Sequence, residues 1–170
     1  MSQPPSGVFF NFSVNARNQF LLSFFAAIFW LLHHIQRSQK PEDKNMETVF
    51  ESFPFLSGYL SDMRQFMPDK ITWEKALVWW QTEIARWEKS SEAFLPLRAR
   101  EEIDGNDFRC RILLILIGLV EEDSRFGDVF SLLQPSVGQR RPTLELAGQI
   151  MRINGHDPDP WRLCRPLLDA

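Results

Sequence analysis

The chain has 170 residues, of which 44% are hydrophobic and 13% are aromatic, and its formal net charge is −3 at pH 7. This length allows one domain or two small packed halves, and the six tryptophans and 15 phenylalanines can supply a large core and a buried interface. The slightly acidic balance excludes the strongly basic surface that nonspecific binding to nucleic acid requires.

The chain divides by pattern into an arm and two halves. Residues 1–15 contain Pro4 and Pro5 and show no helical period, so we expect a flexible N-terminal arm. The N-terminal helical half follows over 16–92. The C-terminal half, 93–170, begins where the strongest helical pattern of the chain has ended.

The first predicted helix, Asn18–Gln39, is unusually apolar. Within it, Phe20–Leu32 has Ser23 as its only polar residue. As a helix this segment spans about 20 Å, less than the roughly 30 Å hydrocarbon core of a bilayer, so the sequence predicts a buried helix. Membrane association through 20–32 is the alternative. The adjacent His33 and His34 point about 100° apart on a helix and therefore do not converge on one metal ion.

Two helical regions follow in this half. Pro54 and Gly58 are expected to divide Met46–Met67 into short helices. The next helix, Thr72–Lys89, has the clearest pattern of the chain, with apolar residues at steps of four and three. These residues are Trp73, Leu77, Trp80, Ile84 and Trp87. Trp79 falls off this stripe, and an exposed tryptophan there would be an interface candidate.

The C-terminal half opens with two further helices. Pro96 suits the first turn of a short helix, and Asp107 can cap an apolar helix over Phe108–Val120. Ile112–Val120 is a continuous apolar run rich in β-branched residues, and this run also suits a buried strand. The residues leave both alternatives open.

The end of the chain shows clearer signals for where helices begin and end. Arg125–Gln134 reads as a short amphipathic helix, and Pro135–Pro142 as a loop. Thr143 is expected to cap a helix over Leu144–Ile153, in which Glu145 lies in the first turn and favours the helix dipole.

No catalytic or metal-binding motif is present. The sequence contains no GxxxxGK[ST], GxSxG or HExxH pattern. Cys110 and Cys164 lie far apart without metal-ligand spacing, which predicts a reduced, cytoplasmic protein. We therefore expect no catalytic residue, no cofactor site and no metal site in this chain.

Arg140 and Arg141 form the compact basic pair of the predicted loop. In a DNA-reading winged helix such a pair would contact phosphate, with the helix over 144–153 as the recognition helix. In that helix, only Gln149 and Arg152 could contact DNA in a groove. A structural role is favoured, in which the arginines neutralise carboxylates and helix C-terminal carbonyls.

Glu121 and Glu122 lie near a predicted helix C-terminus, where negative charge is mildly unfavourable. We therefore expect these carboxylates to pair with nearby arginines. The candidates are Arg125, Arg140 and Arg141.

An ordered set of short motifs resembles a known family. The motifs are Asp123-Ser-Arg125, Leu133-Gln134, Arg140-Arg-Pro-Thr143, Trp161 and Arg165-Pro-Leu167. In this order they resemble the helical, winged-helix-like region that precedes the ATPase module in bacterial AAA+ proteins, including those associated with phage-tail-like contractile injection systems. The resemblance covers roughly the last 65 residues well and the helix over 18–39 loosely. Phe126-Gly-Asp128 departs from the Tyr or Ala common in the family, and the linker Ile153–Pro160 differs too.

This resemblance implies a mainly α fold, a helical bundle with a winged-helix-like C-terminal half. It implies a non-catalytic N-terminal domain that recognises a partner or substrate protein, or sets the packing of a hexamer, in the cytoplasm. ATP and Mg²⁺ are implied only for an ATPase module expected after Ala170. The candidate structural or interface residues are Trp79, Asp123, Arg125, Arg140, Arg141, Thr143, Trp161 and Arg165. A membrane-associated adaptor and a DNA-binding winged helix are the alternatives.

Overall fold

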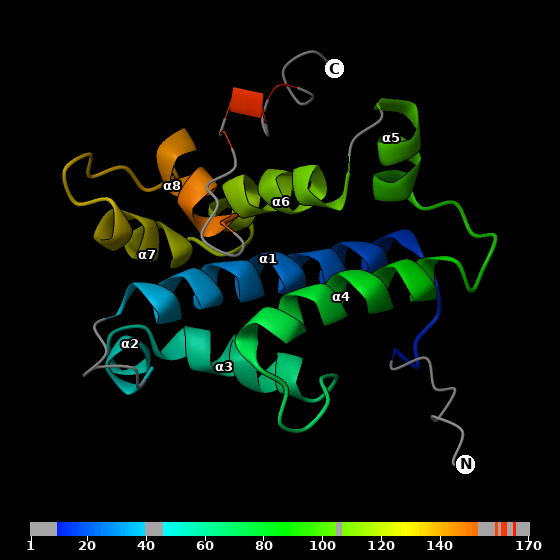
Figure 1. The fold of residues 1–170 in the computed structure, drawn as a ribbon, viewed down its shortest axis with the longest axis horizontal. Coiled ribbons are helices and arrows are strands. Elements are labelled where there is room, and N and C mark those ends of the chain that lie inside the picture. The colour runs from blue at the N-terminus through cyan, green and yellow to red at the C-terminus, as the bar shows by residue number, and fades with distance from the viewer. Residues whose placement is uncertain are drawn as a thin grey trace.

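The computed structural model describes residues 10–39, 46–104 and 107–152, together with residues 159, 161, 162 and 165. Its elements are α1 (Ala16–Ser38), α2 (Glu47–Ser52), α3 (Pro54–Arg64), α4 (Trp73–Glu88), α5 (Pro96–Asp104), α6 (Phe108–Glu122), α7 (Phe126–Leu133) and α8 (Leu144–Ile150). All regular elements of the described residues are helices, which confirms the mainly α class (Figure 1).

Helix α1 runs through the middle of the fold. Every residue from Leu22 to Ile35 is buried, because α3, α4, α5, α6 and α8 all pack against this helix. The predicted buried helix is therefore confirmed. By length and composition, α1 is the one helix of the described residues that could cross a membrane, and 83% of its most apolar window is buried inside the fold.

The remaining helices cover α1 from two sides. Figure 1 shows α2, α3 and α4 along one side and α5 to α8 along the other. One hydrophobic core joins the two groups, and it includes Leu56 of α3, Trp80 of α4, Leu116 of α6 and Phe130 of α7. The two halves that meet at residue 92 in the sequence therefore share one core, because both pack on the same central helix.

Polar side chains fix where three of the helices begin. Asn15 Oδ1 accepts the N–H of Asn18 at 2.9 Å at the start of α1. The predicted caps are confirmed, because Asp107 Oδ1 accepts the N–H of Cys110 at 3.1 Å and Thr143 Oγ1 accepts the N–H of Leu146 at 3.2 Å. Residues 112–120 lie within α6, which selects the helix over the strand.

Three expectations differ from the structure. The helix expected over Leu144–Ile153 ends at Ile150. Gly58 does not end a helix, because α3 runs through it from Pro54. Part of the expected flexible arm is packed: Phe10 is only 3% exposed and stacks on Trp80 at 5.7 Å between ring centroids. The indole N–H of Trp87 also donates to the Phe12 carbonyl at 3.1 Å. Residues 1–9 of the arm lie outside the described residues.

Two histidines and an arginine gather where α1 ends. His33 and His34 are both buried, and Arg37 donates to the carbonyls of Gln149 and Arg152 at the end of α8. A cation there stabilises the helix, because the carbonyls of its last turn carry partial negative charge. Burial and then the charge of Arg37 lower the pKa of His34 to about 4, and the same two causes lower the pKa of His33.

We predict that His34 makes stability sensitive to mild acid. Its pKa is about 6.5 in the unfolded chain and about 4 in the fold, so the unfolded chain binds the proton first as pH falls. The contribution of neutral His34 to the free energy of unfolding is therefore fully present above pH 6.5. The free energy of unfolding declines by about 3 kcal/mol as the pH falls towards 4. His34→Gln should flatten this decline, measured by urea unfolding at several pH values. Parallel declines in the two proteins would contradict the prediction.

Candidate functional site

The Asp-x-Arg motif closes the turn between α6 and α7. Asp123 Oδ1 accepts the backbone N–H of Arg125 at 3.0 Å, and Arg125 Nη2 donates to Asp123 Oδ2 at 2.7 Å. The hydroxyl of Tyr59 on α3 also donates to Asp123 Oδ2 at 3.2 Å, and the Arg125 guanidinium lies 4.6 Å from the Phe55 ring centroid. The motif thus joins the turn to α3.

The charges of this turn follow from these contacts. The hydrogen bond from Arg125 lowers the pKa of the Asp123 carboxyl below its ordinary value, against the opposing effect of burial. Burial, followed by the charge of Asp123, raises the pKa of Tyr59. Asp123 is therefore a charged acceptor shared by Arg125 and Tyr59.

Arg140 and Arg141 are bound to carboxylates of the same half. Arg140 pairs with Asp128 and donates to the Ser124 carbonyl at 2.9 Å. Arg141 pairs with Glu121, which confirms the expected pairing of this carboxylate with a nearby arginine. Both basic side chains therefore meet acidic partners within the fold.

Gln134 holds the loop that carries this basic pair. It is 7% exposed, and its Nε2 donates to the carbonyls of Gln139 at 2.9 Å and Arg141 at 2.5 Å. Its Oε1 accepts the N–H of Thr143 at 3.0 Å. The loop also turns at Gly138, whose φ of 61° is in the left-handed region that favours glycine. Leu-Gln and Arg-Arg-Pro-Thr therefore form one hydrogen-bonded unit.

The departure at Gly127 has a steric reason. A Cβ atom at this position would lie 2.7 Å from Arg140 Nε and 2.8 Å from Arg140 Nη2. Glycine therefore leaves room for the guanidinium of Arg140 to reach both Asp128 and the Ser124 carbonyl. By contrast, Gly118 in α6 faces open space.

A buried polar network that was not predicted from the sequence joins four of the helices. Arg111 of α6 donates to Glu88 Oε1 of α4 at 2.6 Å and to both carboxylate oxygens of Glu101 on α5 at 2.7 Å. Gln19 of α1 donates to the same Glu88 oxygen at 2.7 Å and accepts the N–H of Leu97 at 3.1 Å. Four helices thus meet at one network.

Burial and charge act against each other in this network. Burial alone lowers the pKa of Arg111, but the hydrogen bonds and charges of Glu88 and Glu101 outweigh it and raise that pKa overall. Burial raises the pKa of Glu101, and Arg111 opposes this effect. The available sequence signal is that Glu88 lies four residues after the buried Ile84, on the apolar face of its helix.

The other candidate residues lie apart from this half or at its surface. Trp79 of α4 is half-buried, and its ring contacts Trp80 at 5.2 Å and Phe10 at 5.9 Å between centroids. Figure 1 places α4 across α1 from α7 and α8. The structure therefore does not bring Trp79 to the loop that carries Arg140 and Arg141. Trp161, 65% exposed, and Arg165 are surface residues.

The described residues contain no group of three or more His, Cys, Asp or Glu side chains that could hold a metal ion. Large apolar side chains remain in contact with water at several places. Among the residues that the structure describes, the most exposed of them are Phe94, Trp161, Val78 and Leu132. Comparison of the chain with protein-family models, curated proteins and solved structures finds no match.

We predict that Arg111→Met destabilises the fold by about 3–5 kcal/mol, because Glu88 and Glu101 would be left without their cation. Arg98→Met is the matched control, since the Arg98–Glu102 pair is largely exposed and should contribute less than about 1 kcal/mol. Urea unfolding measures both values. Equal decreases in the free energy of unfolding of the two variants would show that the buried network stabilises the fold no more than the exposed pair does.

A further prediction compares two of the helical glycines, Gly118 of α6 and Gly127 of α7. Gly118→Ala should stabilise the protein by about 0.5–1 kcal/mol through helix propensity alone. Gly127→Ala should stabilise the protein less, because its methyl group displaces Arg140 from its partners. In an Arg140→Ala background, Gly127→Ala should recover the full gain. Identical effects of Gly127→Ala in both backgrounds, measured by thermal unfolding, would contradict this coupling.

Proposed function

We propose that this chain is a non-catalytic N-terminal domain of a cytoplasmic AAA+ ATPase, with a winged-helix-like C-terminal half. It recognises a partner or substrate protein, or sets the packing of subunits in a hexamer. The ordered resemblance from Asp123 to Leu167 supports the family. Motion driven by ATP in a downstream module would reach the partner through this domain.

One observation carries the recognition role. The aromatic side chains of Phe94 and Trp161 are 77% and 65% exposed. Exposed aromatic residues are enriched among those that dominate the affinity of protein interfaces, because they bury a large apolar area when a partner covers them. These positions are therefore the natural contact points for a protein.

The alternatives have less support. A DNA-binding winged helix needs cations free to reach phosphate, whereas Arg140 and Arg141 pair with Asp128 and Glu121. A membrane-associated adaptor needs the apolar face of α1 to reach lipid, whereas residues 22–35 are covered by the other helices. Protein recognition uses the surface that this fold leaves apolar.

The test begins with the gene product isolated from its native source. Intact mass and peptide mapping should find a segment with GxxxxGK[ST] after Ala170, and the purified protein should hydrolyse ATP and assemble as a hexamer. Replacing the P-loop lysine by alanine should abolish hydrolysis, because that lysine reaches the β- and γ-phosphates. A natural chain that ends at Ala170, or one that hydrolyses no ATP, would overturn the proposal.

A further inference from the structure

A hollow opens where α3 turns into α4. Its volume is about 300 Å³, at the lower end of the range for binding pockets, so it suits one aromatic side chain better than a large ligand. Phe29 of α1 and Trp73 of α4 form part of its wall, with stacked rings whose centroids lie 4.9 Å apart. The other lining residues are Leu60, Arg64, Met67, Pro68, Asp69, Lys70 and Ile71.

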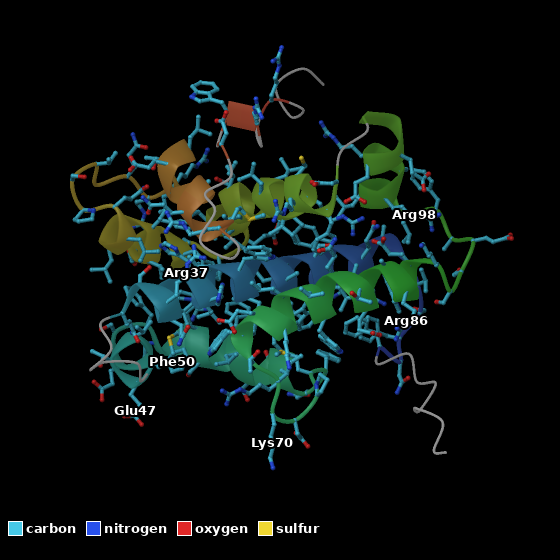
Figure 2. All side chains as sticks on the ribbon, viewed as in Figure 1. Arg37, Glu47, Phe50, Lys70, Arg86 and Arg98 are labelled. Carbon is cyan, nitrogen blue, oxygen red and sulfur yellow. The ribbon has the colours of Figure 1, made fainter. Side chains whose placement is uncertain are left out.

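The rim of this hollow carries net positive charge. Arg64 and Lys70 have no hydrogen-bond or ion-pair partner among the described residues, and Asp69 is the one acidic residue of the lining. Lys70 also has a φ of 62°, a strained backbone conformation for a residue with a side chain. Figure 2 shows Lys70 extending from this turn, away from the rest of the fold. The hollow thus offers an aromatic wall with cations beside it.

The loop between α4 and α5 carries complementary chemistry. Phe94 is the most exposed large apolar side chain of the described residues, at 77%. Glu92, two residues earlier, is exposed and has no hydrogen-bond or ion-pair partner there. Ser91 Oγ accepts the N–H of Ala93 at 3.1 Å, which helps to fix the shape of the loop. An exposed aromatic ring and an exposed carboxylate therefore lie two residues apart in one loop.

Hollow and loop lie at opposite ends of α4. Trp73 begins this helix and Glu88 ends it, so its 16 residues separate the two features by about 24 Å. The loop cannot enter the hollow of its own molecule without unfolding. The hollow of a second copy is open to it.

We propose that the Phe94 loop of one copy docks into the hollow of the next. Phe94 would pack against Trp73, whose ring is stacked on the buried ring of Phe29, and Glu92 would face Arg64 and Lys70. The contact is heterologous, since the two surfaces differ, and repeated copies therefore close into a ring or extend as a filament. The inference deepens the subunit-packing role in the proposed function and rests on it only for the biological setting.

The first experiment measures self-association of the unmodified chain by analytical ultracentrifugation at low ionic strength. We expect concentration-dependent association that weakens with salt, because an exposed carboxylate meets exposed cations. Phe94→Ala should weaken this association at least tenfold. Val78→Ala is the matched control, since Val78 is an exposed apolar residue of α4 outside the hollow, and it should change nothing.

Charge reversal then tests which surfaces meet. One variant carries Glu92→Lys, and a second carries Arg64→Glu with Lys70→Glu. Each should be monomeric alone, because its loop and hollow would bear like charges. Their mixture should associate, because both contacts between unlike variants pair opposite charges. Lys75→Glu, an exposed change elsewhere on α4, controls for net charge, and circular dichroism checks that every variant is folded.

Association that survives Phe94→Ala, or a mixture of charge variants that stays monomeric, would overturn the proposal. A chain that sediments as a monomer at every concentration would overturn it too. These results are independent of ATP hydrolysis, so they separate the two proposals. Self-association without a downstream P-loop would retain this contact and reject the ATPase family, whereas a hexameric ATPase insensitive to Phe94→Ala would do the reverse.

Discussion

The burial of α1 on every side is the constraint on which this fold depends. A helix that is apolar around its whole circumference cannot lie on a surface, so other helices must approach it from all directions. Residues 22–35 are covered without a gap in the sequence, and the covering helices come from both halves of the chain. Helix α1 therefore joins into one core the two halves into which the sequence pattern divides the chain.

Ionisable groups enclosed by such a core are accommodated differently at the two ends of α1. Near the start of α1, Gln19 joins Glu88 and Arg111 in a charged network whose members supply donors and acceptors to one another. Near its end, burial and then the charge of Arg37 lower the pKa values of His33 and His34, which favours their neutral forms. Both solutions avoid an isolated buried charge, whose desolvation would cost more than a single domain can offset.

Local sequence signals predicted much of the fold and little of its long-range chemistry. The steps of three and four in α4 and the caps at Asp107 and Thr143 act within a few residues, and the structure confirms them. The apolar run 112–120 was ambiguous because its outer face is apolar too: Leu114 is exposed and Ile117 and Val120 are half-buried, so no polar residue marks the helical period. The pairing of Arg111 with Glu88 joins residues from different helices, so no local pattern encodes it. The docking of Phe10 on Trp80 likewise depends on the completed tertiary core.

The position of α1 in the chain has a consequence for biosynthesis. The ribosome releases this helix before α4, α6 and α8, which supply most of its cover. Its most apolar segment therefore emerges well ahead of its partners, and the native contacts that bury it span large sequence separations. These contacts form only after a long stretch of chain has been made, and the apolar surface of α1 is open to aggregation until then. The helix at the centre of the finished domain is thus its point of greatest vulnerability during synthesis.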